Sequence, residues 1–199
     1  MKILTIGANG TMGKAVVEEL SKRHEIVSAS RKSGDYRVDI KDLQSVRDLF
    51  QKTAKVDAVV SAAGSVHFGA LADMTTELFD VGLRDKLMGQ VNIVMVAPQY
   101  LNPGGSITLV AGTLSEDPIR YGSSASMVNG AIESFAIAAA VELPPGLRIN
   151  VVSPSLLVES IESYGPYFRG VDAVPAKRVA LAFSKSVEGA QTGKVYRVE

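Results

Sequence analysis

The stretch that decides the fold is ILTIGANGTMGKAVVEEL, residues 3–20. A short apolar run leads directly into glycines spaced G-x-x-G-x-x-G, and an apolar stripe with helical spacing follows. Glycine allows a tight turn and a close approach of the backbone to phosphate, while a helix N-terminus offers free N–H groups and a positive dipole end. This strand–loop–helix order predicts a nucleotide-binding βαβ unit, and the alternative is a tight turn that binds nothing. The candidate binding residues of the loop are Gly7, Asn9, Gly10, Met12 and Gly13.

Outward from this unit, short β-branched runs alternate with segments of helical period. The predicted strands are Lys2–Ile6, Glu25–Ser30, Asp57–Ala62, Ser106–Ala111, Leu147–Ser153 and Lys194–Val198, with a shorter candidate at Tyr36–Ile40. Helical stripes run through Met12–Leu20, Leu43–Phe50 and Val128–Ala139, and a long helix is expected over Leu78–Leu101, ending before Pro103-Gly104-Gly105. The alternation predicts one doubly wound α/β domain over residues 1–199 with a mostly parallel sheet.

Composition narrows the possible functions. Lysine plus arginine (21) equals aspartate plus glutamate (21), so no basic field is present to hold a nucleic acid. The chain has no cysteine, its two histidines are far apart, and we expect no metal site. No apolar stretch is expected to reach the roughly 18–20 residues of a membrane span. These features predict a cytoplasmic protein that acts on a small molecule and binds neither nucleic acid nor membrane.

The end of the second predicted strand indicates which nicotinamide cofactor such a loop would bind. An acidic residue there would accept hydrogen bonds from the ribose hydroxyls of NAD. The sequence instead places Ser30 at that position, followed by Arg31, Lys32 and Ser33. Arginine grips a phosphate with two hydrogen bonds, so Ser30, Arg31 and Ser33 favour NADP(H) over NAD(H). The alternative is a solvated basic turn.

With these residues in place, the whole chain resembles the short-chain dehydrogenase/reductase family, whose fold is of the Rossmann type. The resemblance rests on GANGTMG after the first strand, VDI at residues 38–40, SAAG at residues 61–64, GLRINVVSPS at residues 146–155 and the final TGKVYRV. It implies that Asp39 and Ile40 flank the adenine of the cofactor. It also implies that Ala62, Ala63 and Gly64 line the central part of the cofactor, and that Pro154 to Leu157 face the nicotinamide.

The resemblance also implies an Asn-Ser-Tyr-Lys catalytic set, and here the chain departs from the family. Alignment on the two flanking strands puts the tyrosine position at Ala125, the lysine position at Asn129, the serine position at Gly112 and the asparagine position at Lys86. No Y-x-x-x-K occurs anywhere in the chain. The chain therefore resembles a divergent bacterial subgroup that lacks the usual active-site residues.

A lysine at the asparagine position and an asparagine at the lysine position suggest an exchange across one pocket. We hypothesise that Asn129 hydrogen-bonds the nicotinamide ribose while Lys86 supplies positive charge and a transferable proton. The alternative is that Lys86 is an ordinary solvated helix lysine. Thr113, next to the serine position, is a further candidate for contact with a substrate oxygen, or else a strand-end hydroxyl that caps the backbone.

Around this pocket the sequence offers weaker candidates. Residues 158–175 follow a strand and would form a substrate-side loop or lid that carries Tyr164 and Tyr167. Tyr121 and His67 either approach the pocket or serve packing. Ser123 and Ser124 are interpreted as N-cap residues of a helix that begins near Ala125.

Two functions follow from these expectations. The first is an NADP(H)-dependent oxidoreductase with a non-standard acid–base set, and the second is a redox-inactive NADP(H)-binding sensor or regulatory protein. The resemblance further implies pairing of the helices near Leu78–Leu101 and Ser124–Leu143 in a homodimer or homotetramer. No charged cluster in the sequence points to a substrate class.

Overall fold

The fold is built on one seven-stranded sheet in the computed structural model, which describes residues 1–199. The strand order is β3-β2-β1-β4-β5-β6-β7, and every neighbouring pair is parallel. The strands are β1 (Lys2–Ile6), β2 (Glu25–Ser30), β3 (Tyr36–Arg37), β4 (Val56–Ser61), β5 (Leu101–Val110), β6 (Arg148–Pro154) and β7 (Val195–Val198). This arrangement confirms the predicted doubly wound α/β fold of Rossmann type.

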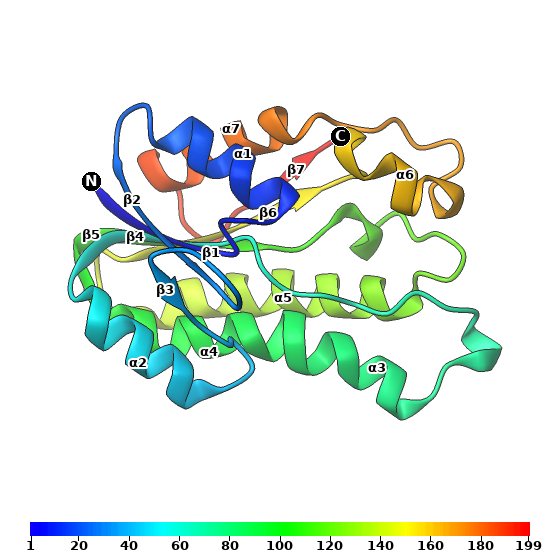
Figure 1. Ribbon diagram of the computed structural model, residues 1–199, viewed down its shortest axis with the longest axis horizontal. Coiled ribbons are helices and arrows are strands. Elements are labelled where there is room, and N and C mark those ends of the chain that lie inside the picture. Colours follow the sequence, from blue (N-terminus) through cyan, green and yellow to red (C-terminus); the bar gives the residue numbers. More distant parts are fainter.

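Helices cover both faces of the sheet, as Figure 1 shows: α1 and α7 lie on one face, and α2, α4 and α5 on the other. The helices are α1 (Thr11–Leu20), α2 (Leu43–Thr53), α3 (Thr76–Gly82), α4 (Met88–Val96), α5 (Ser123–Glu142), α6 (Ile161–Tyr164) and α7 (Ala176–Glu188). Each face has its own apolar core, and Phe50 and Phe183 are fully buried on opposite sides. Burial of each such ring stabilises the fold by about 2–3 kcal/mol.

The long helix expected over Leu78–Leu101 is present as an uninterrupted helical run over residues 76–99, but this run is not α-helical throughout. It consists of α3, a π-helical turn η2 (Leu83–Leu87), α4 and a 3-10 turn η3 (Ala97–Gln99) that contains Pro98. Leu101 already belongs to β5, so Pro103-Gly104-Gly105 lies inside that strand and not after a helix. A π-helical turn adds a residue to the helix and redirects the side chains it carries. Here that turn carries Lys86.

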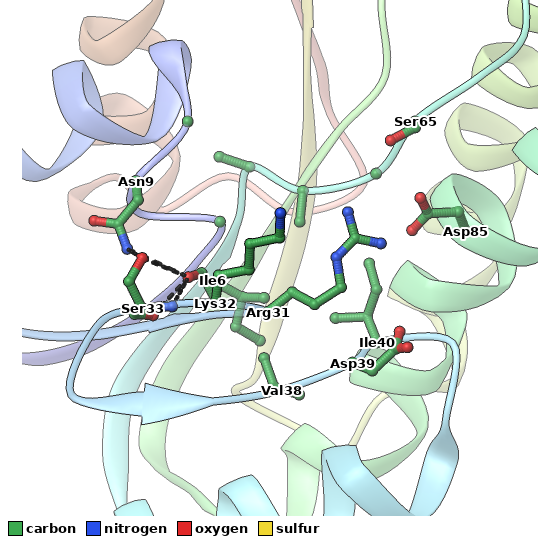
Figure 2. A pocket seen from close by; sticks show the side chains of 16 residues that line it. Ile6, Asn9, Arg31, Lys32, Ser33, Val38, Asp39, Ile40, Ser65 and Asp85 are labelled. Atoms are coloured by element: carbon green, nitrogen blue, oxygen red, sulfur yellow. Dashed lines mark hydrogen bonds between the residues drawn. The ribbon is translucent and has the colours of Figure 1, made fainter.

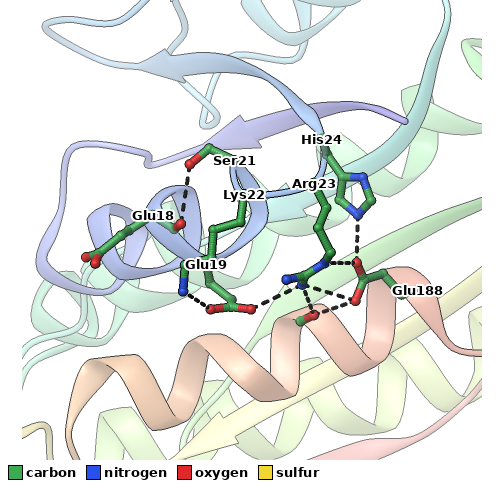
Figure 3. A network of polar contacts seen from close by, with 8 residues as sticks. Glu18, Glu19, Ser21, Lys22, Arg23, His24 and Glu188 are labelled. Carbon is green, nitrogen blue, oxygen red and sulfur yellow. Dashed lines mark hydrogen bonds and ion pairs between the residues drawn. The ribbon is translucent and has the colours of Figure 1, made fainter.

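Sequence analysis did not predict α7, although its apolar residues follow a clear helical stripe. Val179, Ala180, Phe183 and Val187 are buried against the sheet and α1. Figure 3 shows the polar contacts that join the ends of the two helices: Arg23 reaches Glu188 with an Nε–Oε1 distance of 2.8 Å. Glu188 also accepts from Ser184, and His24 Nε2 lies 2.7 Å from Glu188 Oε1. Hydrogen bonding from Arg23, Ser184 and His24 lowers the pKa of Glu188 to about 2.

The start of α5 also differs from expectation. The helix begins at Ser123 with Gly122 at the N-cap, and no side chain caps it. The hydroxyls of Ser123 and Ser124 have no hydrogen-bond partner, so the interpretation of these serines as caps was wrong. By length and composition alone α5 could cross a membrane, with a mean hydropathy of 1.3 over 18 residues, contrary to the expectation that no stretch is long enough. Its buried side packs on the sheet as a core helix, and core helices pass the same test.

Candidate functional site

A long cleft follows the carboxyl ends of the strands on both sides of β1. The cleft has a volume of about 450 Å³ and lies where the strand order reverses between β1 and β4. Ligands bind at this switch point in open α/β sheets. The nucleotide cleft, as we call it, is lined by Ile6, Gly7, Asn9, Gly10, Ser30, Arg31, Lys32, Ser33, Val38, Asp39, Ile40, Ala62, Ala63, Gly64, Ser65 and Asp85 (Figure 2).

The glycine loop is packed so tightly that two of its glycines cannot be replaced without movement. Gly7 has φ +84°, and a Cβ there would lie 2.6 Å from the Ala62 carbonyl oxygen. A Cβ at Gly13 would lie 2.0 Å from the carbonyl oxygen of Gly7. The backbone after β1 thus packs directly against the backbone after β4, next to the N-terminus of α1. No acidic residue or side-chain cap occupies the first turn of α1, whose N–H groups remain open to an anion.

A small polar bridge ties this loop to the end of β2. Asn9 Nδ2 donates to Ser33 Oγ at 2.8 Å and to Ser30 Oγ at 3.3 Å. The Ser30 hydroxyl in turn donates to the Ser33 carbonyl oxygen. Three residues that sequence analysis assigned to the cofactor therefore meet through their side chains and hold the β2–β3 turn against the loop. Figure 2 shows Asn9 and Ser33 joined in this way.

Two cations project into the nucleotide cleft from this turn. Arg31 and Lys32 are exposed, and neither takes part in an ion pair or a side-chain hydrogen bond. Figure 2 shows the Arg31 guanidinium extending across the cleft toward Asp85 and Ser65. Sequence analysis did not assign Asp85 or Ser65 to the cleft. Ser65 directly follows SAAG and could have been found from that motif, whereas Asp85 arrives through the π-helical turn, which left no sequence signal.

The other predicted cofactor residues fall into three places. Asp39, Ile40, Ala62, Ala63 and Gly64 line the nucleotide cleft. Met12 and Gly13 do not line the nucleotide cleft. Met12 packs against the core between α1 and α7, and the missing side chain of Gly13 allows α1 to pack closely against the backbone of Gly7. Asn129, Pro154 and Leu157 line a second, adjacent pocket.

This second pocket, the reaction pocket, has a volume of about 190 Å³ and a mostly apolar lining. It is bounded by the ends of β5 and β6, the start of α5, and the segment after β6. Its lining residues are Val66, Phe68, Lys86, Ala111, Gly112, Leu114, Ala125, Asn129, Pro154, Ser155, Leu156, Leu157, Ser160, Tyr164 and Phe168. The four positions at which the family's catalytic residues were expected thus all line one pocket.

Lys86 and Asn129 meet at the floor of the reaction pocket. Lys86 Nζ donates to Asn129 Oδ1 at 2.7 Å and to the Ala111 carbonyl oxygen at 2.8 Å. The amide N–H groups of Asn129 have no acceptor within the chain, and Asn129 is almost fully buried. Lys86 and Asn129 therefore meet in one pocket through a direct hydrogen bond, and Lys86 is a partly buried lysine rather than an ordinary solvated one.

The electrostatic environment of Lys86 is set by burial and by one carboxylate. Burial lowers the pKa of Lys86 to about 8, because the charged ammonium loses solvation, and the negative charge of Glu133 opposes this shift. Glu133 is itself buried one turn after Asn129 on α5, where it accepts from Ser153 at 2.7 Å and from Ser115 at 3.0 Å. Sequence analysis did not single out Glu133. A lysine with a pKa near 8 exchanges protons readily at physiological pH.

At position 112, where the resemblance led us to expect a serine, packing explains why the residue is glycine. A Cβ at Gly112 would lie 2.8 Å from Asn129 Nδ2, so any side chain at position 112 would require Asn129 to move. Thr113 is buried and does not reach the reaction pocket. It lines a separate hollow with Asp117, Asp172 and Glu199, which removes it as a contact for a substrate in the reaction pocket.

An aromatic cluster closes one side of the reaction pocket. Phe68 lies 5.6 Å from Tyr164 and 5.8 Å from Tyr167, measured between ring centroids, and Tyr167 makes an edge contact with Tyr121 at 6.1 Å. Tyr164 and Phe168 bring part of the 158–175 segment, which folds into short helical turns around α6, onto the pocket. Tyr121 and His67 do not line it.

Residues 2–188 match the sequence profile of a protein family described as enoyl-(acyl carrier protein) reductase. The chain belongs to the short-chain dehydrogenase/reductase family. Among curated family members it is 30% identical over 178 residues to trihydroxynaphthalene reductase PfmaI of Pestalotiopsis fici and 27% identical over 181 residues to tetrahydroxynaphthalene reductase of Pyricularia oryzae. Each match covers 76% of this chain but only 62% of the reductase.

Solved structures of the family match along the entire chain. The protein lin1944 from Listeria innocua is 50% identical, with a TM-score of 0.98 and full coverage of both chains. A small-chain dehydrogenase in complex with NADPH is 27% identical, with a TM-score of 0.89 over all of this chain and 96% of the other. The family uses nicotinamide cofactors, and this chain is similar to a member that binds NADPH.

Proposed function

We propose that this protein is an NADP(H)-dependent oxidoreductase that reduces a carbonyl compound, with Lys86 in place of the family's catalytic tyrosine. The observation that carries the proposal is the Lys86–Asn129 hydrogen bond in a pocket next to the nucleotide cleft. An idle lysine would be expected to keep its charge in solvent, because burial of an ammonium group is costly. Here the ammonium group of Lys86 lies partly buried against Asn129 and Ala111, and the loss of solvation brings the pKa of Lys86 to about 8.

The nucleotide cleft fits NADP(H). The glycine loop leaves no room for side chains beside the open N–H groups of α1, which suits a pyrophosphate. Arg31 and Lys32, both without partners, would hold a 2′-phosphate with help from Ser30 and Ser33. Asp39 and Ile40 would flank the adenine, and Ala62 to Gly64 would line the middle of the cofactor.

The chemistry needs a hydride and a proton, and the bound NADPH would supply the hydride. Lys86 would hold the proton at Nζ and donate it to the substrate oxygen that becomes a hydroxyl. Asn129 would orient Lys86 through Oδ1 and use its free amide N–H groups toward the nicotinamide ribose. Pro154 and Leu157 would form an apolar wall that excludes water on the nicotinamide side.

A second function is a redox-inactive NADP(H)-binding sensor or regulatory protein. The observation that favours it is the bare lining at Ala125 and Gly112, where the usual tyrosine and serine are missing. In that case Lys86 and Asn129 would only hold the cofactor, and the nucleotide cleft would serve as the whole functional site.

Two measurements on the wild-type protein separate these functions. NADPH and NADH are titrated by cofactor fluorescence, and NADPH consumption is then followed with a panel of aldehydes, ketones and quinones. We expect tighter binding of NADPH than of NADH and turnover with at least one class of carbonyl. Binding without any turnover favours the sensor, and failure to bind either nucleotide contradicts both functions.

We also propose that the protein forms a homodimer or homotetramer through α4 and α5. Their outward sides carry apolar side chains that the chain itself leaves in solvent: Met88 is 45%, Met95 57%, Ile137 51% and Val141 86% exposed. Small residues such as Ala138 would allow the helices to approach closely. A monomer in light scattering at micromolar concentration would contradict this proposal.

A further inference from the structure

Lys86 is held in the reaction pocket by contacts along its side chain. Its stem packs against Gly64, where an added Cβ would lie 2.7 Å from Lys86 Cγ, so the missing side chain at position 64 leaves room for the lysine. Its Nζ contacts Ala111 and Asn129, which both line the reaction pocket. The amine is therefore fixed at the wall of a mostly apolar pocket of about 190 Å³.

The partners of Lys86 Nζ suit a neutral amine as well as an ammonium group. Nζ has two acceptors in the chain, the Ala111 carbonyl oxygen at 2.8 Å and Asn129 Oδ1 at 2.7 Å. A neutral amine carries two N–H groups and one lone pair, so loss of one proton leaves both hydrogen bonds in place and frees the lone pair. No aspartate or glutamate lines the reaction pocket. Burial also lowers the pKa of Lys86 to about 8, which gives the neutral amine a share of the population at neutral pH.

A hydrogen-bond donor for a carbonyl oxygen lies beside this amine. Asn129 is 3% exposed, lines the reaction pocket, and has no acceptor within the chain for its amide N–H groups. The missing side chain of Gly112 leaves space at this amide, since an added Cβ there would lie 2.8 Å from Asn129 Nδ2. A donor next to a nucleophile stabilises the negative charge that develops on a carbonyl oxygen under attack. One N–H group of Asn129 is enough for this role, which leaves the other for the nicotinamide ribose.

We propose that Lys86 forms an imine with apolar aldehydes that enter the reaction pocket. The Nζ lone pair attacks the carbonyl carbon, a C–N bond forms, and one amine proton passes to the carbonyl oxygen to give a carbinolamine. The C–O bond then breaks as the C=N bond forms, and the oxygen leaves as water with both amine hydrogens, so the step needs no oxidant or reductant. Phe68, Tyr164 and Phe168 provide an apolar wall for the body of the aldehyde.

This imine site goes beyond the proposed oxidoreductase function and does not require a nucleotide. Proton donation uses the charged form of Lys86, whereas imine formation uses the neutral form. A pKa of about 8 keeps both forms populated near neutral pH. The imine can therefore be trapped without NADPH, and the result is separate from any measurement of turnover.

The test is trapping of the imine with sodium cyanoborohydride in the full-length protein, at pH 7.5 and without nucleotide. Benzaldehyde is the probe, and reduction converts the imine into a benzylamine that peptide mass spectrometry locates. Lys177 on α7 is the matched control, because it is exposed and makes no ion pair or side-chain hydrogen bond. We expect about tenfold more benzyl adduct on Lys86 than on Lys177, because a solvated lysine is almost entirely protonated at this pH.

Asn129→Asp tests whether the partners of Lys86 make the imine possible. A carboxylate in place of the amide, 2.7 Å from Nζ, would hold the lysine in its charged form and remove the donor for the carbonyl oxygen. We expect the adduct on Lys86 to fall about tenfold while the adduct on Lys177 stays the same. Circular dichroism checks folding, and the comparison of Lys86 with Lys177 within the wild-type protein decides the proposal even where this variant does not fold.

Three results would overturn the proposal: no adduct on Lys86, equal labelling of Lys86 and Lys177 in the wild type, or wild-type labelling of Lys86 in folded Asn129→Asp. An adduct on Lys86 in a protein that consumes no NADPH with any carbonyl would support the imine site and contradict the oxidoreductase function. NADPH consumption without an adduct on Lys86 would overturn the imine site and leave the oxidoreductase function standing, so the two failures are distinguishable.

Discussion

The nucleotide cleft and the reaction pocket lie side by side but differ in how the chain builds them. The phosphate-binding part of the cleft comes from one continuous unit, β1, its glycine loop and α1, tied to the end of β2 by Asn9. The reaction pocket draws its polar groups from the π-helical turn and α5, far apart in sequence. The first region is formed by neighbouring residues of one segment, whereas the second depends on a hydrogen bond between Lys86 and Asn129, which are distant in sequence. The cleft can therefore be recognised from one continuous stretch of sequence, whereas the reaction pocket exists only once distant segments pack together.

The largest expected effect tests whether the cleft depends on its close backbone packing. In Gly13→Ala the new Cβ would lie 2.0 Å from the Gly7 carbonyl oxygen, and backbone must shift. We expect a loss of about 2 kcal/mol of stability, the typical cost of overpacking, and at least a hundredfold weaker NADPH binding. Gly10→Ala is the control, because its Cβ would meet no atom closer than 3.5 Å and should leave thermal stability unchanged. Equal stability of the two variants would refute this account of the loop.

A smaller effect concerns cofactor selection at the same cleft. Arg31→Gln removes a cation without a partner of its own, so the fold should be unaffected. We expect NADPH to bind about tenfold more weakly, which is about 1.4 kcal/mol, while NADH binding stays the same. Fluorescence titration of both nucleotides gives the ratio directly. A parallel loss for both nucleotides would show that Arg31 does not select the 2′-phosphate.

In the reaction pocket, Glu133→Gln should change the pH dependence of carbonyl reduction without changing the affinity for NADPH. The charge of Glu133 raises the pKa of Lys86, so its removal should lower that pKa below about 8. The proton-donating form of Lys86 is then lost at a lower pH, and the rate of carbonyl reduction should fall at pH 8 but not at pH 6. Glu18→Gln, an exposed glutamate of α1 that makes no ion pair, serves as the control. The pH profile of NADPH oxidation checks the direction of the shift.

The smallest effect lies outside both sites, at the α1–α7 contact. The pKa of Glu188 is about 2 in the folded protein against an ordinary value of 4.5, so its contribution to stability is present above pH 4.5 and is lost as pH falls toward 2. We expect Glu188→Gln to lower the free energy of unfolding by only about 1 kcal/mol at pH 7, because solvent screens Arg23. Urea unfolding at pH 7 and at pH 2.5 should show the difference shrinking, with NADPH binding unchanged at pH 7.

Sequence reasoning succeeded where the signal is local. β1 and β2 have the predicted bounds, and the glycine spacing locates the cleft because one continuous segment forms it. The same reasoning brought Lys86 and Asn129 to one pocket through alignment on flanking strands. It did not find the π-helical turn that puts Asp85 in the cleft, because a single added residue leaves the apolar pattern of a helix almost unchanged. It also did not find Glu133, whose contacts with Ser115 and Ser153 exist only once distant segments pack together.

The central claim is that the proton donor of this protein is Lys86, next to an intact NADP(H) cleft. Single-turnover oxidation of bound NADPH, with a carbonyl selected from the panel, compares the wild type with Lys86→Met by stopped flow. We predict that Lys86→Met binds NADPH within a few-fold of the wild type but reacts at least a hundredfold more slowly. The wild-type rate should fall as pH rises through about 8. An unchanged rate in Lys86→Met would contradict the account.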